Sequence, residues 1–231
     1  MAQFTSTKTV TESLTSTLFK SLYMQMSAAL TITGLVAYFL SQSTAYINML
    51  INSPAMLWIV LIAQLGVVIW LSARLHAMSM TSATVLFILY SVLTGVSFGT
   101  LFLVYDMSDI IATFFVTAGT FFVTSLVGYV TKMDLSKMGS ILMMLLIGLI
   151  IATIVNMFLG SQGLYMACTY LGVIIFVGLT AWDTQRIKSM FMEHGTADES
   201  GQKLALMGAL MLYLDFINLF IYLLRLIGNR D

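Results

Sequence analysis

Residues 204–227 have the sequence LALMGALMLYLDFINLFIYLLRLI. These 24 residues are largely apolar, and a helix needs about 20 such residues to cross a bilayer. Asp215 lies near the middle, with 11 uncharged residues before it (204–214) and nine after it (216–224). A carboxylate at that depth costs about 2.5–3.5 kcal/mol on insertion scales, and such groups usually mark an ion or proton path. The stretch therefore predicts a spanning helix that carries a functional aspartate.

The whole chain has the composition of an integral membrane protein. Hydrophobic residues make up 59% of its 231 residues and charged residues 9%, and its mean hydropathy is +0.97. A soluble domain carries roughly a quarter charged residues. The formal net charge is zero, which gives no indication of nucleic-acid binding. The single cysteine, Cys168, cannot form an intramolecular disulfide, and no Cys/His cluster predicts a zinc or haem cofactor.

Seven segments are long and apolar enough to span a bilayer. They are residues 21–41, 56–74, 82–105, 109–131, 138–160, 163–187 and 204–227. We expect one all-α integral membrane domain, residues 21–231, that forms a seven-transmembrane-helix bundle. Residues 1–20, rich in Ser and Thr, are expected to form a polar and partly disordered tail, not a signal peptide. The longest connections are 42–55, which holds Pro54, and the hydrophilic stretch 188–203.

The distribution of Lys and Arg predicts the orientation. A cytoplasmic N-terminus places eight basic residues inside and only Arg225 and Arg230 outside, with the C-terminus outside. The eight are Lys8, Lys20, Arg74, Lys132, Lys137, Arg186, Lys188 and Lys203.

Small residues four apart favour close helix packing in membranes. The pairs Gly95 with Gly99 and Gly148 with Ala152 have this spacing. The first pair also brackets Ser97 in a G-x-S-x-G match. That motif needs a strand-to-helix elbow and a His partner in a serine hydrolase. Here it lies inside an apolar span, so we interpret its glycines as packing residues.

Polar side chains recur on one face of the last helix at spacings of three or four. These residues are Gly208, Met211, Asp215, Asn218, Tyr222 and Arg225. Asn218 and Tyr222 are therefore expected to line a pathway beside Asp215. The alternative is an aspartate that only holds packed helices together through hydrogen bonds.

Two further residues complete the candidate site. Asp183 lies near the inner end of the sixth segment, and Arg74 ends the second. An arginine near a carboxylate favours its ionised form, whereas a second carboxylate disfavours it, so two close aspartates would titrate as a coupled pair. Contact between Asp183 and Asp215 requires the sixth helix to continue inward past Asp183, or the seventh to begin later than residue 204. An interfacial arginine that only fixes the topology is the alternative for Arg74.

The segments 178–185 (GLTAWDTQ) and 208–220 (GALMLYLDFINLF), followed by Leu223-Leu224-Arg225, resemble the Bax-inhibitor family (the transmembrane Bax-inhibitor motif family). The similarity extends to Tyr90-Ser91-Val92-Leu93-Thr94-Gly95 and Val155-Asn156, and is greatest to the proteobacterial inner-membrane branch. It implies a seven-helix bundle with the C-terminal helix at its centre, in the bacterial inner membrane. Position 182 is Trp where the family usually has Tyr or Phe, so a hydroxyl group is lost there.

The resemblance also implies a function, a pH-sensitive calcium leak. Asp183 and Asp215 would be the proton sensor and a weak calcium site, and Arg74 the latch. Calcium prefers six to eight oxygen ligands, more than two aspartates and Asn218 supply without water. The expected partners are membrane lipid, calcium ions, protons and other membrane proteins, with no cofactor and no enzymatic activity.

Three other functions were weighed. An intramembrane aspartyl protease resembles a Gly-x-Gly-Asp pattern, which precedes neither aspartate here. A proton/cation exchanger could use the same pair, although no inverted repeat is evident in the hydropathy pattern. A membrane-embedded regulatory protein, acting on a membrane protease or in stress survival, would need the aspartates only for its fold.

Overall fold

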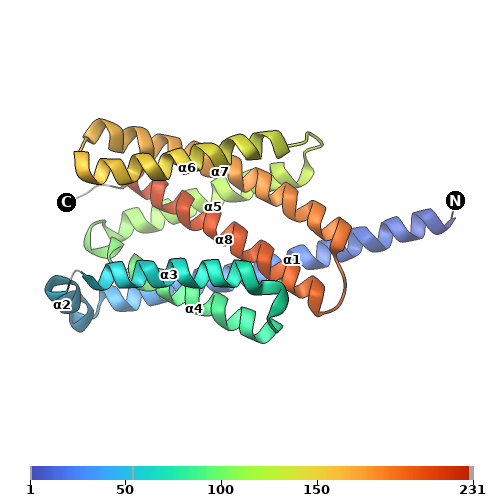
Figure 1. Ribbon diagram of the computed structural model, residues 1–231, viewed down its shortest axis with the longest axis horizontal. Coiled ribbons are helices and arrows are strands. Elements are labelled where there is room, and N and C mark those ends of the chain that lie inside the picture. Colours follow the sequence, from blue (N-terminus) through green and yellow to red (C-terminus); the bar gives the residue numbers. More distant parts are fainter. Residues whose placement is uncertain (1, 54, 229–231) are drawn as a thin grey trace. The chain divides into compact units, whose positions relative to one another are not determined.

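The computed structural model describes residues 2–53 and 55–228, and only the backbone of residues 2–10; Pro54 lies outside the described residues. Within these ranges the structure is helical, without strands. The helices are α1 (Ala2–Ser41), α2 (Thr44–Asn52), α3 (Ala55–Arg74), α4 (Met80–Phe98), α5 (Met107–Val130), α6 (Ser136–Leu159), α7 (Gln162–His194) and α8 (Glu199–Ile227) (Figure 1). All except α2 are long and apolar enough to cross a membrane, which confirms the seven predicted spans.

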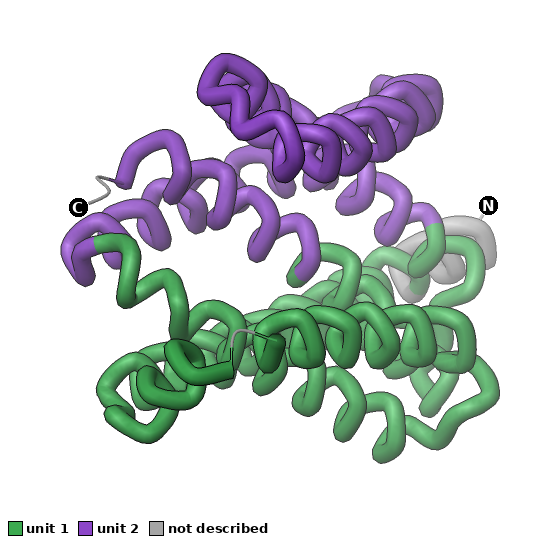
Figure 2. The backbone as a smooth tube through the Cα atoms, turned by 60° about the vertical axis from the view of Figure 1, so that its left-hand side comes forward, with its two compact units in different colours: residues 1–105, 190–213, 231 green, residues 106–189, 214–230 purple. Residues whose placement is uncertain are grey.

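The chain divides into two compact units, coloured separately in Figure 2. Unit 1 comprises residues 1–105 and 190–213, so it holds α1 to α4, the end of α7 and the first half of α8. Unit 2 comprises residues 106–189 and 214–230, so it holds α5, α6, most of α7 and the second half of α8. The aspartates 183 and 215 both belong to unit 2.

Unit 1 is organised around the contact of α1 with α4. A Cβ atom on Gly95 would lie 2.7 Å from Val36 Cβ and 2.8 Å from the Thr33 carbonyl oxygen, so only glycine fits there. This confirms the predicted packing role of Gly95, and Gly99 likewise lies against the Tyr46 ring. The buried Thr33 hydroxyl bonds the Tyr213 hydroxyl of α8 at 2.7 Å.

The described part of unit 2 contains four close approaches at glycines, two of them at residues 181 and 182. A Cβ atom on Gly128 of α5 would collide with the Ala181 backbone of α7, and one on Gly139 of α6 would collide with the Trp182 ring. The predicted packing role of Gly148 is wrong within this structure, because nothing lies within 4 Å of its Cβ position. Gly172 against the Tyr222 ring and Gly178 against the Leu142 side chain are the other two close approaches.

Two segments expected to be irregular are helical. The N-terminal tail belongs to α1, where Leu18 is buried and the Phe19 ring lies 5.1 Å from that of Phe191. The connection 188–203 shortens to residues 195–198, because α7 continues to His194 and α8 begins at Glu199. Packing of these polar turns against neighbouring helices stabilises helix where the sequence shows no apolar run.

The last helix is the most buried of the seven spans. Within its most apolar window 67% of residues are buried, against 11–44% in the other six. Its predicted place at the centre of the bundle stays a prediction.

Candidate functional site

Asp183 and Asp215 are brought together inside unit 2. Asp183 on α7 is 9% exposed and Asp215 on α8 is 5% exposed. Their carboxyl groups hydrogen-bond to each other. An ionised carboxylate only accepts hydrogen bonds, so this bond requires one of the two groups to hold a proton. The pair can therefore exist in a state that shares one proton and a state that has lost it.

The two aspartates meet because α7 is longer than its apolar stretch. Asp183 lies about 16 Å before the end of α7 at His194, at a rise of 1.5 Å per residue. Asp215 lies about 24 Å after the start of α8 at Glu199. The four-residue connection between the helices, 195–198, makes them antiparallel neighbours. The two depths differ by only about 8 Å along the helices, and the carboxyl groups lie close enough to interact. The sixth spanning helix therefore continues inward past Asp183, which is the first of the two conditions given above for contact between the aspartates.

Each aspartate keeps one oxygen without a partner. Asp183 Oδ1 and Asp215 Oδ2 are buried and accept no hydrogen bond from any residue that the structure describes. A buried polar atom left unsatisfied costs about 1–3 kcal/mol. Such atoms in native proteins indicate hydration, an ion or a functional role, such as a proton held between the two carboxyl groups.

The groups that face the pair within unit 2 are few. Thr184, fully buried beside Asp183, joins its hydroxyl to Ser125 Oγ on α5 at 3.0 Å. The charged group that acts on Asp183, apart from Asp215, is the Arg186 guanidinium. Arg186 is exposed, with its guanidinium 5.4 Å from the centre of the Trp182 ring.

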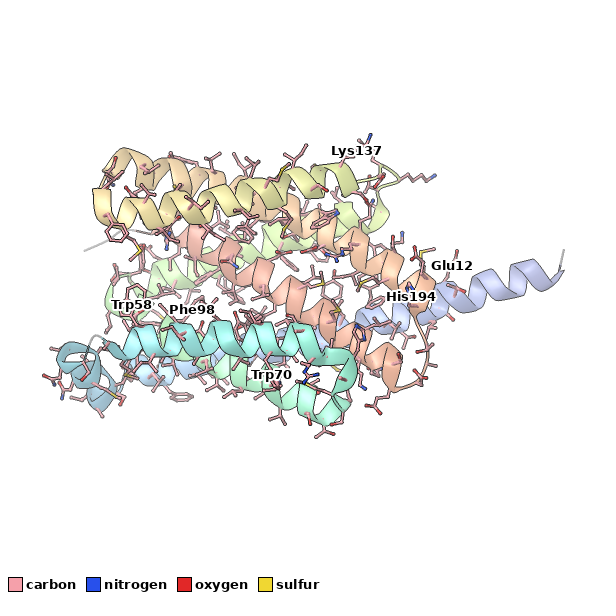
Figure 3. All side chains as sticks on the ribbon, in the orientation of Figure 1. Glu12, Trp58, Trp70, Phe98, Lys137 and His194 are labelled. Atoms are coloured by element: carbon pink, nitrogen blue, oxygen red, sulfur yellow. The ribbon has the colours of Figure 1, made fainter. Side chains whose placement is uncertain are left out.

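Arg74 belongs to unit 1. It is exposed at the end of α3, and its guanidinium lies 5.6 Å from the centre of the Trp70 ring, which Figure 3 labels on the same helix. Its role as a latch stays a prediction.

The two predicted lining residues have defined contacts of their own. Asn218 donates its side-chain N–H to the Leu214 carbonyl, at 2.8 Å, within α8. The Tyr222 ring lies directly over Gly172 and stacks against Phe176 at 5.7 Å. Both are half-buried, and their role along a pathway stays a prediction.

The donor set is small for a metal centre. Among residues 2–53 and 55–228, no group of three or more His, Cys, Asp or Glu side chains could hold a metal ion. Two carboxyl groups provide too few oxygens for tight calcium binding, which takes six to eight.

A stripe of buried side chains on α5 was not predicted from the sequence. Thr113 and Thr117 are fully buried, and Phe121 and Ser125 are 6% and 3% exposed. The sequence does contain their spacing, because the four residues recur at intervals of four and so lie on one helix ridge. Three of them carry hydroxyl groups within an apolar span.

The chain was compared with known proteins. The family described as Inhibitor of apoptosis-promoting Bax1 matches residues 15–231. Inner membrane protein YbhL of Escherichia coli K12 is 47% identical over 215 residues, 93% of this chain and 92% of that protein. RP147 of Rickettsia prowazekii is 44% identical over 223 residues, covering 96% and 93%. An uncharacterized membrane protein of Streptococcus pyogenes serotype M1 is 33% identical over 185 residues, covering 80% of each chain.

The match over nearly the whole chain and the seven apolar helices agree with each other. The protein is a multi-pass protein of the inner membrane, and it belongs to the Bax inhibitor family.

Proposed function

We propose that this protein conducts a slow cation leak across the inner membrane, with calcium as the principal ion, and that the Asp183–Asp215 pair regulates it by binding a proton. The observation that carries the proposal is the direct interaction of two buried carboxyl groups, on α7 and α8, in a span that supplies no donor to Asp183 Oδ1 or Asp215 Oδ2. Calcium as the ion rests on the family resemblance.

The proton would act as the closing ligand. With one proton shared, the carboxyl groups hold α7 and α8 together through their hydrogen bond. Without it, two carboxylates about 4 Å apart repel by about 4 kcal/mol at an effective dielectric constant of 20. That energy changes a conformational equilibrium on the order of a thousand-fold. It is enough to separate the helices if the closed and open states of the bundle have similar free energies. Flux therefore rises with pH.

The charges around the pair set the pH range of this switch. Arg186 follows Asp183 by three residues on α7, and a guanidinium near a carboxylate favours its ionised form. In the proposed closed state Arg74 is the latch that pairs with the free carboxylate. The weak calcium site of Asp183 and Asp215 is one of passage, because its two carboxyl groups need water to complete the coordination shell.

The test is calcium flux into liposomes that contain the purified protein, measured from pH 6 to 8. The parent protein is expected to conduct more as the pH rises. Asp183→Asn and Asp215→Asn keep the size and hydrogen-bonding capacity of the side chains but cannot titrate, so both should lose the pH dependence. Asp134→Asn, a substitution at an exposed residue in the connection between α5 and α6, is the matched control that should keep it.

Each negative outcome has a definite meaning. Unchanged pH dependence in both variants would falsify the aspartate switch. Stoichiometric proton counter-flow would identify an exchanger. No flux above that of empty liposomes at any pH would favour a regulatory protein that acts through helix contacts.

A further inference from the structure

The buried stripe on α5 begins near one end of the helix and reaches the aspartate pair. Asp109, in the first turn of α5, is followed at intervals of four by Thr113, Thr117, Phe121 and Ser125. The Thr117 hydroxyl donates to the Thr113 carbonyl at 2.7 Å. Thr113 Oγ1 has no hydrogen-bond partner among the described residues although its side chain is fully buried.

An unpartnered hydroxyl in a lipid-spanning helix indicates access to water or to an ion. The same holds for the free oxygens of Asp183 and Asp215. All three atoms lie in unit 2. The unsatisfied oxygens thus occur both on the α5 stripe and at the aspartate pair.

Two contacts connect α5 to the two aspartates. Ser125 bonds Thr184, the residue after Asp183. The Phe121 ring lies 5.5 Å from that of Phe216, the residue after Asp215. The segment from Phe121 to Ser125 therefore runs alongside the pair.

Aromatic rings interrupt the stripe between its hydroxyl groups. Phe121 stands between Thr117 and Ser125, and Phe216 contacts both Phe121 and, at 5.7 Å, Phe114. Phe216 is 4% exposed. A hydrophobic constriction of this kind blocks hydrated ions by excluding water.

We propose that Thr113 and Thr117 line the route along which water and hydrated cations reach the aspartate pair, and that the Phe121–Phe216 ring pair is the gate on it. The gate is coupled to the pair because Phe216 follows Asp215 directly. Rotation of α8 that separates Asp215 from Asp183 also moves Phe216 relative to Phe121. This inference rests on the proposed leak and assigns its route.

Thiol labelling tests the route without measuring flux. In a Cys168→Ser background, each position is changed to cysteine and treated with a small, membrane-impermeant cationic methanethiosulfonate reagent. The reagent is added on the side from which Ser108→Cys, exposed just before the stripe, reacts. Thr113→Cys and Thr117→Cys should react at least ten-fold faster than Phe122→Cys, a position that is 67% exposed on the outside of the helix and therefore faces lipid.

The gate is tested at Ser125→Cys, beyond the ring pair. It should react slowly alone and at least ten-fold faster when Phe121→Ala is added. Phe121→Leu, which keeps an apolar plug, should leave the rate low and also controls for misfolding. Thr117→Cys reacting no faster than Phe122→Cys overturns the route, and an unchanged Ser125→Cys rate in the Phe121→Ala protein overturns the gate.

Calcium-flux measurements then distinguish a failure of the proposed route from a failure of the proposed leak. Phe121→Ala should raise calcium flux several-fold at pH 6, whereas Phe122→Ala should match the parent. A parent protein that conducts nothing refutes the leak, while the labelling rates still decide whether the route exists. A conducting parent with an unchanged Phe121→Ala variant refutes the gate alone.

Discussion

Asp183 on α7 and Asp215 on α8 share a hydrogen bond between two buried carboxyl groups, and each is the other's acidic neighbour. The bond makes the two residues energetically dependent on each other. Replacing one aspartate with an apolar residue leaves the other carboxyl group buried and without its hydrogen-bond partner. Replacing both removes the polar atoms together, which is a much smaller perturbation.

The first prediction concerns stability. Asp215→Leu should lower the free energy of unfolding by about 1–3 kcal/mol relative to Asp215→Asn, because it leaves the Asp183 carboxyl unsatisfied. The double variant Asp183→Leu/Asp215→Leu should recover most of that loss. Unfolding in mixed detergent micelles measures these variants together with the second single variant, Asp183→Leu. A double variant as unstable as the sum of its single variants would show that the two groups do not interact.

The second prediction concerns the approach of α5 to α7. Gly128→Ala should destabilise the protein by about 1–3 kcal/mol, the usual cost of overpacking, because its Cβ atom would meet the Ala181 backbone. Gly119→Ala on the same helix is the control, since nothing lies within 4 Å of that position. It should be neutral or stabilise by up to about 1 kcal/mol. Equal melting temperatures for the two variants would contradict the close approach.

The seven spans could be predicted because the length of an apolar run is a direct consequence of bilayer thickness. The ends of the helices could not. The polar turns of α1 before residue 21 and of α7 after residue 187 are helical through contacts such as Phe19 with Phe191. Hydropathy does not contain that information. The length of α7, in turn, decides whether Asp183 reaches the depth of Asp215.

The site was predicted in part for the same reason. A carboxylate such as Asp215 is conspicuous inside an apolar stretch, so it could be identified from the sequence. Thr113 and Thr117 are not conspicuous, because threonine is common in membrane helices and bonds its own backbone. Their significance comes from the full burial of both side chains and from the unpartnered Thr113 Oγ1, which only the fold shows.

The third prediction concerns the connection between α5 and α6. The Gln185 side chain of α7 donates to the Met133 carbonyl at 2.7 Å and accepts from the Leu135 N–H at 2.9 Å. Gln185→Leu removes both bonds and should cost about 1–3 kcal/mol, at roughly 0.5–1.5 kcal/mol for each bond. Amide hydrogen exchange should accelerate in residues 131–135. Gln162→Leu, at an exposed position, serves as control. Unaltered exchange in Gln185→Leu would show that the two Gln185 hydrogen bonds do not hold the connection in place.

The last prediction concerns the short connection that makes α7 and α8 neighbours. Asp198 accepts hydrogen bonds from the Thr196 hydroxyl at 2.6 Å and the Ser200 N–H at 2.9 Å, so it caps the start of α8. The Thr196 hydroxyl and the backbone N–H groups hold the pKa of this carboxyl below its usual value.

A lowered pKa means that the folded state favours the ionised Asp198, so the cap stabilises the fold above the unfolded pKa of about 3.9. That contribution is lost as the pH falls through the lower folded value. Asp198→Ala should therefore melt below the parent at pH 6, and the difference should shrink steadily as the pH is lowered below about 4. Asp106→Ala, at the start of α5 where the Asp106 side chain makes no capping bond, is the control. A gap between parent and Asp198→Ala that stays constant down to pH 3 would mean that ionised Asp198 does not cap α8.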